Sequence, residues 1–133
     1  MPISATYEAL RRIAQEEFGE LVVVAEIQHL STGDPRKLRL TLVDHSSIDI
    51  FISVKGRYSY HWDRTGDLPN TIYRHDNAPH KAWRAITTYP KHFHNGSEQN
   101  VTESHISEQP PTALREFCYF VLQMLRTEAQ ERT

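Results

Sequence analysis

Histidines crowd one short stretch of the chain, RHDNAPHKAWRAITTYPKHFH, which runs from residue 74 to residue 94. It holds four of the eight histidines, four basic residues and one acid, Asp76. His92 and His94 are two residues apart, so an extended backbone would point both imidazoles to the same side. With His80 and Asp76 they would offer nitrogen and oxygen ligands to a divalent metal such as zinc or manganese. Because a bound metal can activate water, this set predicts a metal-dependent hydrolase or nuclease.

The same stretch also fits cleavage of RNA without a metal. That reaction needs a base for the ribose 2′-OH, an acid for the leaving 5′-oxygen and a cation for the charge that develops on phosphorus; histidine titrates in the range that suits either proton role. The candidates for acid and base are His61, His80, His92 and His94. The candidates for binding phosphate and RNA are Tyr60, Arg74, Asn77, Lys81, Arg84 and Lys91, with Trp62 and Trp83 as further rings on which bases could stack.

Each of these groups also has a structural interpretation. The histidines could bind backbone carbonyls and hold an irregular loop in shape. Tyr60 and Trp62 alternate with polar residues, which is typical of the core face of a strand. Arg74 and Asp76, two residues apart, could pair with each other, and Asn77 could cap the backbone of a turn. A non-enzymatic protein whose basic, histidine-rich surface binds nucleic acid or a partner protein is therefore a third alternative.

Two terminal helices and a set of strands are expected to position this stretch. Apolar residues at helical spacing predict a helix near residues 7–18 and another from residue 110 onward. Strands are predicted near residues 20–30, 38–42, 48–52, 57–63 and 71–75, and residues 76–96 show no sustained period. Short connections between strands predict an antiparallel meander. The expected fold is an α+β domain with four to six strands and both helices on one face.

The composition sets limits on the class of protein. A chain of 133 residues is expected to form one domain, residues 1–133. The net charge of −2 argues against a protein that coats nucleic acid, although residues 55–94 carry seven Lys or Arg against three Asp. The single cysteine, Cys118, excludes an internal disulfide. With no secretory signal and no apolar run of membrane-spanning length, a cytoplasmic location is expected.

Four blocks of the chain carry a resemblance to a known family: RYSYHW, TIYRHDNAPHKAWR, YPKHFHNGSE and VTESHIS, followed by the helix sequence ALREF. In order and spacing they resemble the TumE-like toxins of prokaryotic toxin–antitoxin pairs, from about Lys37 to the C-terminus. The family's motif positions are matched by Tyr60, His61, Trp62, Arg74, Asp76, Asn77, Pro79, His80, Pro90, His92 and His94. The resemblance implies a growth-inhibiting toxin that a cognate antitoxin, of the helix-turn-helix type, binds and neutralises.

We therefore expect a small cytoplasmic toxin that acts as an endoribonuclease, with a histidine pair as acid and base and with no cofactor. It would act on RNA and bind an antitoxin protein, and it would not contact a membrane. Two alternatives stay open: a metal-dependent hydrolase that uses Asp76, His80, His92 and His94, and a binding protein that catalyses no reaction. The RNA target and the oligomeric state, a homodimer included, also stay open.

Overall fold

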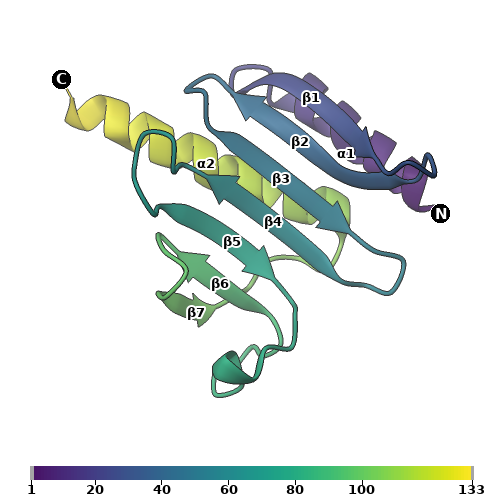
Figure 1. Ribbon diagram of the computed structural model, residues 1–133. Coiled ribbons are helices and arrows are strands. Elements are labelled where there is room, and N and C mark those ends of the chain that lie inside the picture. The colour runs from purple at the N-terminus through teal and green to yellow at the C-terminus, as the bar shows by residue number, and fades with distance from the viewer. Residues whose placement is uncertain (1, 133) are drawn as a thin grey trace.

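The computed structural model describes residues 2–132 and contains one antiparallel sheet with two long helices on one of its faces (Figure 1). Helix α1 (Ile3–Glu17) begins the chain and helix α2 (Pro110–Glu131) ends it. The strands between them are β1 (Val22–His29), β2 (Pro35–Leu42), β3 (Ser47–Ile52), β4 (Tyr58–Asp63), β5 (Ile72–Asp76), β6 (His92–Asn95) and β7 (Val101–Glu103). A short 3-10 helix, η1 (Lys81–Trp83), lies in the connection from β5 to β6.

The strands pair in the order of the chain, and each is antiparallel to the next. The predicted α+β meander with terminal helices on one face is therefore confirmed. The predicted count of four to six strands is wrong, because the sheet has seven. β6 lies in the stretch that shows no sustained period, and β7 is only three residues long, too short for alternation to be visible in sequence.

Alternating residues along the central strands point to the helices and form the core. The strand residues of this core are Leu38, Leu40, Leu42, Ile48, Ile50, Ile52, Tyr58, Tyr60 and Trp62. They share one cluster with Tyr7, Leu10 and Ala14 of α1 and with Leu114, Phe117 and Val121 of α2. The buried Tyr7 hydroxyl donates to the Ile52 carbonyl at 3.1 Å and accepts from the Ile52 amide at 2.8 Å. Helix α1 is thus held to β3 by hydrogen bonds as well as by apolar contacts.

The opposite face of the sheet carries polar side chains, and neither long helix covers it (Figure 1). Direct partners on neighbouring strands share a face. One row of such partners crosses the sheet from β1 to β6 and consists of Glu26, Arg39, Asp49, His61, Arg74 and His94. Within it the Arg39 guanidinium donates to the Asp49 carboxylate at 2.8 Å, and Lys37 adds a bond at 2.9 Å. The row leads to the β5–β6 pair, where the histidines lie.

Candidate functional site

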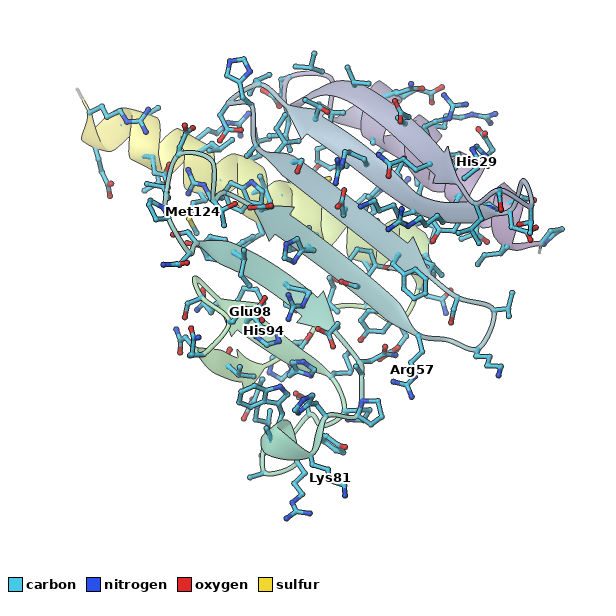
Figure 2. The ribbon with its side chains drawn as sticks, in the orientation of Figure 1. His29, Arg57, Lys81, His94, Glu98 and Met124 are labelled. Carbon is cyan, nitrogen blue, oxygen red and sulfur yellow. The ribbon has the colours of Figure 1, made fainter. Side chains whose placement is uncertain are left out.

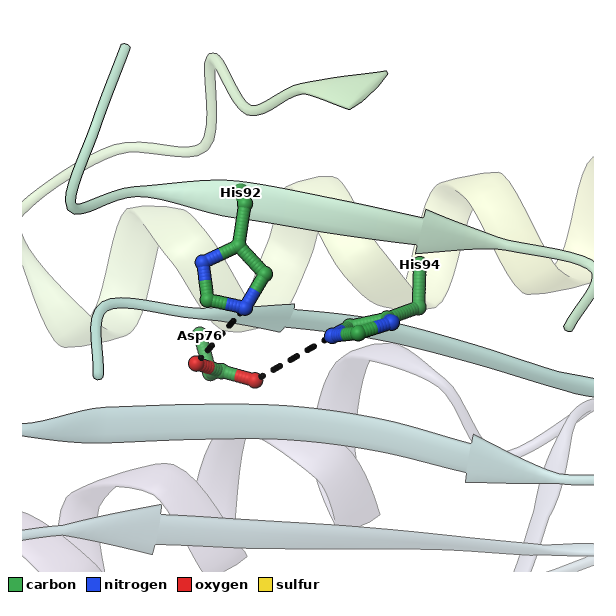
Figure 3. Close-up of side chains that lie close together, drawn as sticks. All are labelled: Asp76, His92 and His94. Carbon is green, nitrogen blue, oxygen red and sulfur yellow. Dashed lines mark ion pairs between the residues drawn. The ribbon is translucent and has the colours of Figure 1, made fainter. Parts of the chain in front are cut away.

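The pairing of β5 with β6 brings one carboxylate and two imidazoles together on the polar face. Asp76 is the direct partner of His92, and Arg74 is the direct partner of His94. His92 Nε2 lies 3.1 Å from Asp76 Oδ1, and His94 Nε2 lies 3.9 Å from Asp76 Oδ2 (Figure 3). One ligand atom from each of these three residues lies within 4.8 Å of the others. We call this set the Asp76–His92–His94 centre.

Backbone carbonyls fix the orientation of both imidazoles. His92 Nδ1 lies 2.9 Å from the carbonyl oxygen of Pro90, and His94 Nδ1 lies 2.9 Å from that of Glu98. A carbonyl oxygen only accepts hydrogen bonds, so each Nδ1 must carry the hydrogen, and each Nε2 is left facing Asp76. The structural interpretation, in which these histidines bind carbonyls, is confirmed for Nδ1. The hydrogen bonds to the carbonyls do not explain why both Nε2 atoms face the Asp76 carboxylate.

Arg74 ties the centre to the loop that follows β6. Its Nε donates to Asp76 Oδ2 at 2.9 Å, and its two terminal nitrogens each donate to a Glu98 oxygen at 2.8 Å. Glu98 and His94 lie side by side at this end of β6 (Figure 2). The hydrogen bonds from Arg74 lower the pKa of Glu98 below its usual range. The predicted pairing of Arg74 with Asp76 is therefore confirmed, and the guanidinium charge is shared between two carboxylates.

Burial and the Arg74 charge keep two imidazoles neutral. Burial lowers the pKa of His94 and Arg74 lowers it further, against the hydrogen bond to the Glu98 carbonyl, which raises it. The pKa of His61 is lowered by the same two causes, burial first. His61 Nδ1 lies 3.4 Å from Arg74 Nη1, so it accepts from the guanidinium. At pH 7 both rings thus present a nitrogen lone pair.

The connection that carries η1 covers the centre from one side. The Trp83 ring centroid lies 6.3 Å from that of His92 and 5.9 Å from that of His94. His80 precedes η1, and its Nδ1 accepts from the Ala82 amide at 3.4 Å. His80 is exposed and lies near the centre only through Trp83, at 6.1 Å between centroids. Of the four predicted metal ligands, the structure gathers three and leaves His80 outside.

The comparison with known families identifies the chain. Residues 9–125 match the family described as Toxin TumE. The chain belongs to this toxin family. No curated protein and no solved structure matches it. Among the described residues, no helix has the length and apolar character needed to cross a membrane.

Several residues expected to bind RNA in this toxin have structural roles instead. Tyr60 is 2% exposed, and Trp62 is fully buried on the helix side of the sheet, so neither ring can stack on a base. The Asn77 side chain accepts from the Tyr58 amide at 2.9 Å and donates to the Gly56 carbonyl at 2.8 Å. These bonds hold the turn before β4 against the end of β5. Asn77 thus has a structural role, but its partners lie in a different turn from the predicted one, where Asp76 Oδ1 accepts from the Ala78 amide at 3.0 Å.

The four predicted cations of the toxin divide into two kinds. Arg74 is bound to Asp76 and Glu98. Lys91 donates to the Ile106 carbonyl, and its Nζ lies 3.1 Å from the Glu108 carboxylate. Lys81 and Arg84, by contrast, are exposed on and beside η1, and Figure 2 shows Lys81 projecting from the tip of this segment. Of the four cations, only Lys81 and Arg84 are exposed at the surface, where they could bind a phosphate.

Sequence reasoning missed Glu98 as a member of the site. It follows His94 by four residues in the loop between β6 and β7, and both its carboxylate and its carbonyl oxygen contact the site. One acid in a polar loop gives no periodic signal. His75, the fourth histidine of the stretch, points to the other face, where its ring stacks on Phe93 at 4.1 Å and its Nδ1 lies 2.7 Å from Ser104 Oγ.

Proposed function

We propose that this toxin inhibits growth by cleaving RNA at the Asp76–His92–His94 centre. The observation that carries the proposal is the convergence of two imidazole nitrogens and a carboxylate on the polar face, within 4.8 Å of one another. Such a set can deprotonate a hydroxyl directly or through a bound metal. The centre lies on the sheet face that neither long helix covers (Figure 1).

The residues around the centre suit a nucleic-acid backbone. Lys81 and Arg84 are exposed on the segment that covers the centre, and cations in such positions bind phosphates. Trp83 is half-buried between them and the two histidines, so the outer part of its ring is available for stacking on a base. The local positive charge of this segment supports RNA as the ligand despite the net charge of −2.

The proposed reaction is transesterification within the RNA chain. The ribose 2′-OH loses its proton to a base, the 2′-oxygen attacks the adjacent phosphorus, and the bond to the 5′-oxygen breaks. The leaving 5′-oxygen takes up a proton, so the products carry a 2′,3′-cyclic phosphate and a 5′-OH. No oxidant or second substrate is needed, which fits a toxin that acts alone once released from its antitoxin.

The pair His92 and His94 can supply both proton transfers only if its rings turn. Each of His92 and His94 has Nδ1 on a backbone carbonyl and Nε2 toward Asp76, so neither presents a free nitrogen to a substrate. His61 and His80 have one nitrogen each engaged with a neighbour. The orientation of the rings in the centre therefore supports the metal-assisted alternative.

The test of the proposal is cleavage of RNA by the purified toxin. Total RNA incubated with the full chain should be cut, and the His94→Asn variant should be inactive because it lacks the Nε2 atom. The matched control is His105→Asn, since His105 is exposed and lies away from the centre, paired with Glu103 at 3.2 Å. If His94→Asn cleaves RNA as fast as the control, the centre is not the site. If the wild-type toxin arrests growth but cuts no RNA under any condition, the binding-protein alternative is correct.

We further propose that a cognate antitoxin of the helix-turn-helix type binds this toxin. Membership of a toxin family supports such a partner, because a growth-inhibiting protein must be neutralised in the cell that makes it. Expression of the toxin alone should arrest growth, and expression together with the product of an adjacent small gene should restore it and yield a complex that co-purifies. Full toxicity in the presence of every neighbouring gene product would reject this partner.

A further inference from the structure

We infer that the Asp76–His92–His94 centre binds one divalent transition-metal ion, with His92 Nε2, His94 Nε2 and a carboxylate oxygen of Asp76 as its protein ligands. The inference concerns the same site as the proposed function and gives it a cofactor. It is nevertheless a statement about binding, so it can be tested without RNA.

The first support is the direction of the ring nitrogens. Each Nδ1 donates to a backbone carbonyl at 2.9 Å, which leaves both Nε2 atoms facing the Asp76 carboxylate. Histidines that bind metals are oriented in this way, with the second nitrogen donating to a carbonyl or a carboxylate. A proton on His92 Nε2 would account for its 3.1 Å contact with Asp76. It would leave His94 Nε2, at 3.9 Å from the carboxylate, without an explanation.

The second support is the charge of the surroundings. The carboxylates of Asp76 and Glu98 flank a single guanidinium, that of Arg74, and both accept hydrogen bonds from it at 2.8 or 2.9 Å. Two carboxylates and one guanidinium give the group a net charge of −1. A divalent cation between the two rings and Asp76 is therefore attracted rather than repelled, and the hydrogen bond from Arg74 orients Asp76 as a ligand.

The distances between the ligand atoms show how far these atoms must move for one ion to bind. Zinc lies about 2.0–2.2 Å from nitrogen and oxygen ligands, so ligand atoms around one ion are about 3–3.5 Å apart. The pair His92 Nε2 and Asp76 Oδ1, at 3.1 Å, already meets this spacing. His94 Nε2 lies 3.9 Å from the other oxygen, Asp76 Oδ2, and the three ligand atoms lie within 4.8 Å of one another. Binding of one ion must therefore shorten the widest of these separations by up to about 1–1.5 Å.

The donor set also narrows the class of metal. Two imidazoles and one carboxylate suit Zn²⁺, Mn²⁺ or Fe²⁺, and leave coordination positions for water or a phosphate oxygen. The side chains of His92 and His94 are 3% exposed and that of Asp76 is 12% exposed, and the Trp83 ring contacts both imidazoles, with centroids 6.3 and 5.9 Å away. Such a shell limits access of bulk water and favours retention of an ion once it is bound.

The experiment measures metal binding by the full chain after removal of metals with a chelator. Zn²⁺ or Mn²⁺ is added and the excess removed by desalting, and the bound metal is then determined by mass spectrometry of the elements. Calorimetry gives the affinity, and Co²⁺ provides a visible absorption spectrum that reports nitrogen and oxygen ligands. We expect one ion per chain and a higher thermal unfolding midpoint with metal than without, because the ion binds the folded form.

The decisive variant is His94→Asn, which removes Nε2 and keeps an amide nitrogen where Nδ1 donates to the Glu98 carbonyl. It should fold, as judged by circular dichroism, and lose both the bound ion and the thermal shift. Asp76→Asn should do the same. His105→Asn, at the exposed His105–Glu103 pair, should bind like the wild type. Retention of one tightly bound ion by both His94→Asn and Asp76→Asn, or no binding by the wild type, would overturn the inference.

The two proposals can fail separately. One bound ion in a protein that cleaves no RNA would support the metal site and reject the proposed reaction. RNA cleavage by a protein that binds no metal would support the proposed reaction and reject the metal site. It would assign the proton transfers to a histidine pair.

Discussion

His92 and Asp76 face each other as direct partners across the β5–β6 pair, with Nε2 of one 3.1 Å from Oδ1 of the other. The connection that contains η1 separates the two residues in sequence, and the hairpin brings them together. The same hairpin places Arg74 beside His94 and within reach of Glu98. Substitutions that disturb the hairpin will therefore disturb the centre, and a useful variant must remove one atom of the centre while keeping the pairing of the strands.

The first prediction separates folding from function. Leu40→Ala removes a fully buried side chain from β2 and should lower the free energy of unfolding by about 2–4 kcal/mol, because apolar contact is lost and a cavity remains. His94→Asn keeps the hydrogen bond to the Glu98 carbonyl, so it should change this free energy by less than about 1 kcal/mol. Urea denaturation measures both.

Growth assays with the same two variants complete that comparison. The His94→Asn toxin should no longer arrest growth although it is folded, whereas Leu40→Ala should retain toxicity in proportion to the folded fraction that remains. If His94→Asn unfolds the protein as severely as Leu40→Ala does, the role of His94 is structural.

Local alternation in the sequence was sufficient to predict part of the centre. The i, i+2 spacing of His92 and His94 predicted that both imidazoles would lie on one side, and the structure confirms this on β6. The alternation of Tyr60 and Trp62 with His61 correctly predicted that the two aromatic residues would face the core and His61 the other face. These conclusions need only the period of a strand, which is a local property.

Register across a long connection could not be predicted in this way. Nothing in the residues between Asp76 and His92 fixes which β5 residue faces which β6 residue, because the stretch has two prolines and no sustained period. The ligand role of His80 was inferred from its type, but its Nδ1 instead accepts from the first turn of η1. Glu98 was missed because its contacts depend on that same register.

The second prediction concerns stability in acid. The pKa of His75 is lowered from 6.5 to about 4, chiefly by burial and also by the charge of Lys91, against the opposing effect of Asp76. Above pH 6.5 the folded and unfolded forms are both neutral at this residue. As the pH falls from 6.5 toward 4, the unfolded chain binds a proton that the folded chain does not, so the free energy of unfolding should decrease.

His75→Asn is the variant that isolates this contribution, since asparagine cannot take up the proton and can still bond to Ser104 Oγ. Urea unfolding of both proteins at several pH values between 7 and 4 should show a smaller decrease for the variant, whatever its stability at pH 7. Parallel curves would mean that His75 titrates normally in the folded protein.

The third prediction concerns the cations beside η1. If Lys81 and Arg84 bind phosphates, replacing both by alanine should weaken binding of single-stranded RNA. It should also reduce the magnitude of the slope of the logarithm of the association constant against the logarithm of the salt concentration by about 1.4, because each of the two phosphate contacts contributes about 0.7. Fluorescence anisotropy with a non-cleavable 2′-deoxy oligonucleotide measures the slope. Arg12→Ala is the control, because Arg12 is exposed on α1 on the other side of the sheet and should leave it unchanged.

The last prediction identifies the nucleophile from the ends of the cut RNA, and the base from the effect of a chelator. If the ribose 2′-OH attacks phosphorus, the cut ends must carry 2′,3′-cyclic phosphate, and an RNA with a 2′-deoxy residue at the cut must resist. This result is the same whether an imidazole removes the proton directly or a bound metal assists its removal. Chelation distinguishes the two: EDTA should abolish cleavage, and Zn²⁺ or Mn²⁺ should restore it, since an ion held by Asp76, His92 and His94 would assist the loss of the proton. Cleavage that continues unchanged in EDTA, with cyclic ends, would assign the proton transfers to histidines that have turned away from Asp76.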